Sequence, residues 1–139
     1  MSATKAIRFL HHLRIPEGPL AGKPVKLAPF QREFVKGALA KGTAAAVLSV
    51  GRGNGKSALS AGLALGALLG VWDDQPRREV LIAARTRDQA RIAFDFVTGF
   101  LAGLDDDVQA ACRIRRSPRL EIEFEDHRGS HFLRAIAAE

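Results

Sequence analysis

Apolar residues along the chain fall into alternating strand-like and helix-like runs. Residues 44–50 form a short, nearly unbroken apolar run, which is typical of a strand buried on both faces of a parallel sheet. Residues 57–71 are apolar on almost every side, as in a helix that other protein surrounds. A second apolar run at residues 79–84 predicts another strand. Strands and helices therefore alternate in the central part of the chain.

The segment after the second predicted strand carries the signals of a helix. Thr86 is followed three residues later by Gln89, which is the spacing of a capping box at a helix N-terminus. Apolar residues then recur at intervals of three and four up to the acidic run 105–107, which predicts an amphipathic helix. Its apolar positions are Ala93, Phe96, Val97, Phe100, Leu101 and Leu104.

The N-terminal segment lacks such a pattern. Pro16, Pro19 and Pro24, together with several glycines, predict an extended N-terminal arm over residues 1–28. Pro29 then predicts the start of a helix, because proline is tolerated in the first helical turn.

The C-terminal segment has the pattern of a hairpin. Residues 120–125 alternate with period two, and residues 130–136 can pair with them across a short turn. Glu121, Glu123 and Glu125 would then share one side of the first strand. We expect an exposed acidic face there, which gives these carboxylates no catalytic role.

A glycine-rich loop between the first strand and the first central helix indicates phosphate chemistry. Residues 50–57 read Val-Gly-Arg-Gly-Asn-Gly-Lys-Ser, close to the pattern G-x-x-x-x-G-K-[ST], with Val50 where that pattern has its first glycine. Small residues let backbone N–H groups surround polyphosphate oxygens. Lys56 would add a positive charge for the β- and γ-phosphates, and the Ser57 hydroxyl would ligate Mg²⁺. The loop therefore predicts ATP binding within an α/β doubly wound fold.

The charge balance favours an anionic partner. The chain has 139 residues, enough for one domain, with 21 lysines and arginines against 15 aspartates and glutamates, and a net charge of +6. Such a basic surface attracts nucleic acid by phosphate contacts and counterion release. The alternative is that the arginines are solvated charges balanced by neighbouring carboxylates. The basic clusters are Arg77-Arg78, then Arg85, Arg87 and Arg91, then Arg113, Arg115, Arg116 and Arg119.

Other candidate chemistry is weak. Cys112 is the single cysteine, which fits a reducing cytoplasm, and it has no recognisable base partner. His127 and His131 are four residues apart, but no further cysteine or acidic ligand is placed to complete a zinc site. No apolar stretch is long and pure enough to span a bilayer, and the N-terminus lacks the apolar core of a signal peptide.

Three segments together resemble a known family. Residues 15–31 end in Leu-Ala-Pro-Phe-Gln, the loop 51–57 has an arginine four residues before its lysine, and residues 84–90 read Ala-Arg-Thr-Arg-Asp-Gln-Ala. This combination resembles the N-terminal part of the ATPase domain of a tailed-phage large terminase, over most of residues 14–139. Loops of that family often lack the first glycine, so Val50 fits the resemblance.

The resemblance implies a fold and roles for particular residues. The implied fold is a P-loop NTPase of the additional-strand, RecA- or helicase-like type, with a mostly parallel sheet flanked by helices, occupying residues 29–139. Lys56 and Arg52 would act in catalysis, Arg52 by stabilising the γ-phosphate, and Gln31 would select adenine. ATP and Mg²⁺ would be the cofactors, with Ser57 ligating the metal. The implied nucleotide-binding set is Gln31, Gly51, Arg52, Gly53, Asn54, Gly55, Lys56 and Ser57.

The resemblance also implies partners. The family drives double-stranded DNA into a procapsid as a homo-oligomeric ring, with portal protein and small terminase subunit, in the host cell cytoplasm. These 139 residues contain neither the acidic strand that carries the family's catalytic base nor the family's nuclease domain. We therefore expect the 139 residues to be part of a longer protein and their sheet to be incomplete. Two alternatives remain open: a helicase-like or other nucleic-acid-dependent ATPase, and a basic nucleic-acid-binding module without catalysis.

Overall fold

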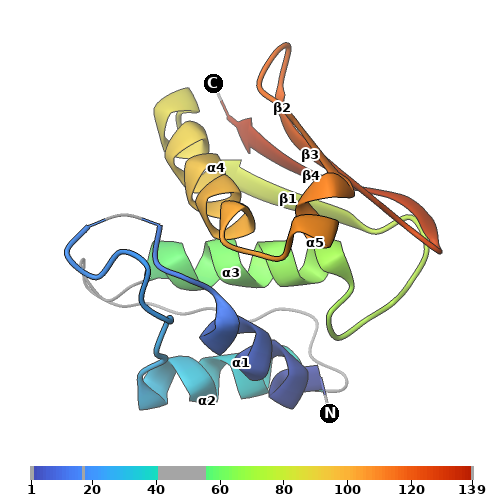
Figure 1. Cartoon of the computed structure of the whole chain (residues 1–139). Helices are drawn as coiled ribbons and strands as arrows, with labels where there is room; N and C mark the ends of the chain where they lie inside the picture. Colours follow the sequence, from blue (N-terminus) through green and yellow to red (C-terminus); the bar gives the residue numbers. More distant parts are fainter. Residues whose placement is uncertain (1, 17, 41–55, 139) are drawn as a thin grey trace.

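The computed structural model describes residues 2–16, 18–40 and 56–138. Two helices lie in the described residues before position 41, and a mixed sheet with three further helices lies in those from position 56 on (Figure 1). The first two helices are α1 (Ser2–His12) and α2 (Pro29–Ala38). After them come α3 (Lys56–Leu69), β1 (Glu79–Ala84), α4 (Arg87–Ala102), α5 (Asp106–Ala110), β2 (Cys112–Arg115), β3 (Leu120–Asp126) and β4 (Gly129–Ala137).

Helix α1 corrects the expectation of an extended arm over residues 1–28. Ala6 and Leu10 lie one helical turn apart on the buried face of α1, and Leu13 continues that face beyond its end. The prolines used to predict an arm begin only at Pro16, so they leave the first twelve residues free to be helical. Helix α1 packs against α2 and α3.

The elements predicted in the centre of the chain are confirmed where the structure describes them. Helix α2 begins at Pro29, β1 spans the predicted second strand, and the hydroxyl of Thr86 accepts a hydrogen bond from the Gln89 N–H at the start of α4, at 3.1 Å. Helix α3 ends two residues earlier than the predicted Val71, because Gly70 adopts a φ of 72°. The strand predicted at 44–50 lies outside the described residues.

The four described strands form one sheet in the order β1-β4-β3-β2. The predicted hairpin is confirmed: β3 and β4 are antiparallel, with Ile122 opposite Leu133. β2 pairs with β3 antiparallel as well, and β1 pairs with β4 in parallel. The α/β class is therefore confirmed, whereas the expectation of a mostly parallel sheet is wrong for these strands, because the hairpin places two antiparallel pairs beside one parallel pair.

Helices α3 and α4 both pack against the sheet, where they contact β1 and β4 (Figure 1). Phe94 and Phe100 of α4, Leu65 of α3 and the paired residues Ile122 and Leu133 are fully buried in this core. Among the described residues, no helix has the length and apolar character needed to cross a membrane.

Candidate functional site

The predicted phosphate loop lies at the start of α3. Gly51, Arg52, Gly53, Asn54 and Gly55 are outside the described residues. Lys56 and Ser57 form the first helical turn of α3, although their side chains are also outside the description. The backbone therefore places the end of the loop at a helix N-terminus, which is where N–H groups are available to an anion.

Gln31 lies beside that helix start, in the wall of a pocket of about 240 Å³. Ala58 and Leu59, from the first turns of α3, line the same pocket. Phe96 and Phe100 of α4 add aromatic rings whose centroids are 5.9 Å apart. The pocket wall is completed by Ile15, Pro16, Val25, Lys26 and Leu27. Most of these side chains are apolar, so the pocket suits a flat, largely apolar group with polar edges.

The carboxamide of Gln31 is buried and fixed. The residue is 8 % exposed, and its Oε1 accepts a hydrogen bond of 2.8 Å from the N–H of Ala28 at the start of α2. Gln31 therefore does not face solvent from helix α2. The hydrogen bond orients the amide group at the pocket wall.

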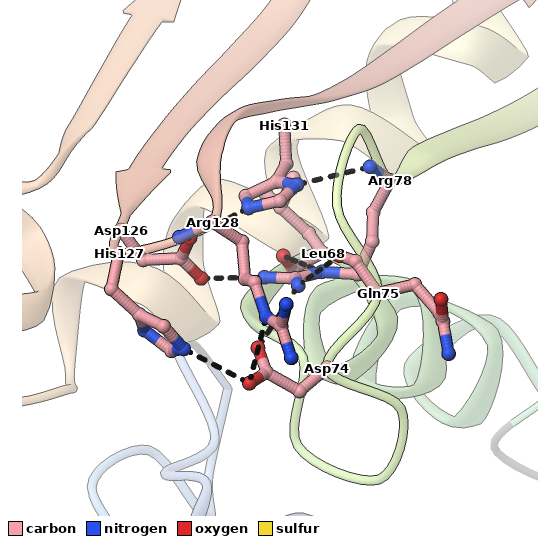
Figure 2. A network of polar contacts seen from close by, with 8 residues as sticks. All are labelled: Leu68, Asp74, Gln75, Arg78, Asp126, His127, Arg128 and His131. Atoms are coloured by element: carbon pink, nitrogen blue, oxygen red, sulfur yellow. Dashed lines mark hydrogen bonds and ion pairs between the residues drawn. The ribbon is translucent and has the colours of Figure 1, made fainter.

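The opposite end of α3 is held by a buried polar network around Arg78 (Figure 2). The Arg78 guanidinium donates to the Leu68 carbonyl at 3.2 Å, and its Nη2 donates to the Asp126 carboxylate at 2.8 Å. The side chain of Arg78 is only 7 % exposed and that of Asp126 16 %. Arg78 therefore joins the last turn of α3 to the β3–β4 turn.

His131 completes this network from β4. Its Nδ1 accepts a hydrogen bond of 3.0 Å from the Arg78 N–H, so that nitrogen carries no proton in this arrangement. Its Nε2 then donates to the Asp126 carboxylate, 2.8 Å away. With both ring nitrogens engaged and no exposed surface, His131 offers no lone pair to a metal.

Gly70 makes room for the network. A Cβ at this position would lie 2.7 Å from the Arg78 Cζ, and the positive φ is itself unfavourable for other residues. Burial raises the pKa of the Asp126 carboxyl, but hydrogen bonds from His131, Arg78 and the Arg128 N–H outweigh it and hold that pKa well below its usual range. The network is thus a structural clamp built on a charged carboxylate.

The acidic face expected on β3 is covered by arginines. Glu121 is buried, and its carboxylate contacts Arg134 at 2.7 Å and Arg115 at 2.9 Å. Arg115 also reaches Glu123 at 2.8 Å. The expectation of an exposed acidic face is therefore wrong for Glu121 and Glu123, which cross-strand arginines neutralise, whereas Glu125 is exposed. Arg115 is correspondingly a paired structural residue, as in the solvated-charge alternative.

Cys112 and His127 are the remaining candidates. Burial raises the pKa of the Cys112 thiol to about 11, which keeps it protonated and a poor nucleophile. His127 pairs with Asp74 at 3.1 Å, and possible ligand atoms of His127, Asp74 and Asp126 all lie within 4.8 Å of one another. The expectation that no acidic ligand lies near His127 is therefore wrong, although exposed acidic groups are common without a metal. The sequence-based interpretation did not identify Arg78, Asp126 and His131 as partners; their separation along the chain, up to 53 residues, leaves no local signal.

Comparison with known proteins supports the resemblance to phage terminase large subunits. The chain is 40% identical over 94 residues to the terminase large subunit of Enterobacteria phage HK97, a match that covers 66% of this chain. The crystal structure of the HK97 bacteriophage large terminase superimposes with a TM-score of 0.78 over 99% of the chain, at 25% sequence identity. The resemblance to phage terminase large subunits is confirmed. No protein-family model matches the chain.

The similarity covers only part of the HK97 terminase. The chain spans 18% of the length of the HK97 terminase large subunit and 27% of the solved HK97 chain. The superposition nevertheless extends over almost all of this chain, so the arrangement of α3, the sheet and α4 belongs to the shared structure.

Proposed function

We propose that these residues form the ATP-binding part of a viral DNA-packaging motor. The observation that carries the proposal is the place of the Gln31 pocket: it opens beside the first turns of α3, directly after Gly55, Lys56 and Ser57. A base in the pocket and a phosphate tail at the helix N-terminus would belong to one nucleotide. The similarity to the HK97 terminase supports the same assignment.

The residues present suit an adenine nucleotide. The half-buried Phe96 offers apolar surface to the face of a purine ring, and the fixed amide of Gln31 can hydrogen-bond to its edge. Lys56 and Arg52 would neutralise the terminal phosphates, Arg52 through its planar set of donors. Ser57 would hold Mg²⁺, which supplies charge neutralisation between the phosphates.

In the motor, hydrolysis at this site would be coupled to translocation of duplex DNA into a procapsid. The partners would be portal protein and small terminase subunit, around a homo-oligomeric ring in the host cytoplasm. Loss of the γ-phosphate would be transmitted by loop and domain displacements, as in other NTP-driven switches. Strand separation without translocation would instead favour the helicase-like alternative.

The first experiment measures ATP affinity of the chain and of Lys56→Ala by calorimetry in the presence of Mg²⁺. Removing the ammonium group should weaken ATP binding about a hundredfold, the loss of one charge-assisted contact of about 2–3 kcal/mol. Lys23→Ala, at an exposed lysine of the N-terminal segment, is the control and should bind like the parent. Equal affinities of parent and Lys56→Ala would refute the proposal and favour the non-catalytic nucleic-acid-binding module.

A second experiment tests the role of Gln31. Gln31→Ala should lower the preference for ATP over GTP, since a residue that hydrogen-bonds the base edge discriminates between bases. The same substitution also removes the bond to the Ala28 N–H and destabilises α2. That structural effect would weaken both nucleotides alike, so an unchanged ATP-to-GTP ratio would show that Gln31 does not read the base.

A further inference from the structure

A second concave surface, distant in sequence from the phosphate loop, is lined by four arginines. It has a volume of about 500 Å³ and combines three elements: the first turns of α4, the β2–β3 connection and the last residues of β4. We call it the arginine groove. Arg87 and Arg91 come from α4, and Arg116 and Arg119 from the β2–β3 connection. β1 and β4 are parallel and both end at this edge of the sheet, the edge at which α/β folds bind ligands.

Among the described residues, the lining of the groove contains four arginines and no carboxylate. Three of these arginines pair with carboxylates outside the lining: Arg91 with Asp88 at 3.1 Å, Arg116 with Asp95 at 2.8 Å and Arg119 with Glu121 at 3.4 Å. The side chains of Arg91 and Arg119 are 60% and 63% exposed, and each guanidinium has five N–H donors, so donors remain for a ligand. The described lining residues from α4, the β2–β3 connection and the end of β4 therefore surround the groove without a carboxylate among them.

One of the arginines is held in position. Arg116 stacks over the Phe94 ring, with its Cζ 5.2 Å from the ring centroid, while Asp95 binds its Nη1. A guanidinium fixed in this way loses less conformational entropy when it binds an anion. By contrast, Arg115, which neighbours it in sequence, is committed to Glu121 and Glu123 on the sheet.

We propose that the arginine groove binds the phosphate backbone of double-stranded DNA. This assignment rests on the proposed packaging function and adds a contact site for its substrate. Four guanidiniums from two chain segments present more N–H donors along the groove than a single phosphate requires, whereas a DNA strand presents one charge every 3.4 Å or so along its axis.

The lining favours a duplex over a single strand. Proteins that hold single strands stack bases on aromatic side chains, and none of the described residues that line the groove is aromatic. Small residues, Ala90, Ala135 and Ala137, form part of its wall instead. Phosphate contacts alone carry no sequence information, so binding at the groove is independent of sequence.

The test measures binding of a fluorescent DNA duplex of about 24 base pairs between about 50 and about 200 mM salt. The variant Arg91→Gln/Arg119→Gln removes two groove charges, and Arg8→Gln/Arg113→Gln removes two exposed arginine charges elsewhere. The groove variant should bind about tenfold more weakly, and its slope of log affinity against log salt should fall by about 0.9 for each lost phosphate contact. The control variant should stay within about twofold of the parent, since its charges act only at a distance.

Several results would overturn the proposal. They are an absence of duplex binding by the parent, equal losses in the two variants, or an unchanged groove variant. A single strand of the same length that depends on the groove more than the duplex does would also contradict it. If tripolyphosphate affinity falls with the groove variant as far as DNA affinity, the groove holds a nucleotide tail and not DNA. None of these results changes the Lys56→Ala comparison, so the nucleotide proposal stands or fails separately.

Discussion

The two ends of helix α3 contrast in how their surroundings are built. At its N-terminal end, after the glycine-rich loop, a pocket of about 240 Å³ lies between α2, α4 and the first turns of α3. At its C-terminal end, Arg78, Asp126 and His131 fill the space with hydrogen bonds (Figure 2). Among the described residues, one end borders a pocket, and the other is filled by hydrogen-bonded side chains.

The difference indicates that the two ends of α3 have separate roles, the C-terminal end as an anchor and the N-terminal end as a pocket wall. We call this the division between the two ends of α3. The clamp connects the last turn of α3 to the β3–β4 turn, and within the described part of the chain no buried side-chain nitrogen or oxygen lacks a hydrogen-bond partner. A helix fixed at one end presents its other end in a defined position, which is what binding a phosphate tail requires. The following predictions test this division, from the largest expected effect to the smallest.

Removing Arg78 should have the largest effect on stability. Arg78→Met leaves the Asp126 carboxylate buried without its cation, and breaking such a pair costs about 3–5 kcal/mol of unfolding free energy. Chemical denaturation measures the loss. If the two ends of α3 have separate roles, the folded fraction of Arg78→Met should bind ATP with nearly the affinity of the parent. A stability loss below about 1 kcal/mol would contradict a clamp that holds α3.

Neutralising Asp126 should produce a smaller, pH-dependent loss. Asp126→Asn should cost about 2–3 kcal/mol at neutral pH, the value of hydrogen bonds to a charged group. Because the folded protein holds the pKa of Asp126 below its unfolded value, its stabilisation is present above the unfolded pKa and is lost as pH falls through the folded pKa.

The difference in stability between parent and Asp126→Asn should therefore shrink as pH falls from about 5 to about 2. Denaturation curves at several pH values give this difference directly. A difference that is constant with pH would mean that the carboxylate charge contributes nothing to the clamp.

Truncating a pocket wall should weaken nucleotide binding without affecting the clamp. Phe96→Ala removes apolar surface facing the pocket, so ATP affinity should fall about tenfold, which corresponds to about 1.4 kcal/mol. Ile92→Ala, on an exposed position of the same helix, is the matched control. Equal ATP affinities for the two variants would exclude the pocket as the base site.

Breaking the exposed ion pair of α2 should change the unfolding free energy least. Lys36 and Glu33 are 3.6 Å apart with both side chains exposed, so Lys36→Ala should change the unfolding free energy by less than about 0.5 kcal/mol. A larger change in chemical denaturation would show that surface pairs matter here as much as the clamp.

Local sequence patterns predicted the elements whose signals are local. Pro29 marked the start of α2, Thr86 marked the start of α4, and alternation marked the β3–β4 hairpin. Helix α1 was missed because its buried residues, Ala6 and Leu10, form too short a pattern to outweigh the prolines that follow. The parallel pairing of β1 with β4 was not predictable either, since it joins segments about fifty residues apart.

For the candidate site, short local motifs indicated only single positions. Gln31 came from the segment 27–31 and the start of α3 from the loop 50–57. The pocket walls depend on how α4 packs against α3, and the clamp depends on partners brought together by the sheet. Arg115 was grouped with free basic residues because its cross-strand carboxylates are visible only once the register is known.

A crystal structure of the chain with Mg²⁺ and a nonhydrolysable ATP analogue tests the central claim most directly. The predicted result is adenine in the Gln31 pocket against Phe96, with the phosphates at the N-terminus of α3 and the Arg78 clamp unchanged. An analogue bound elsewhere, with the Gln31 pocket empty, would contradict the assignment of the two ends of α3.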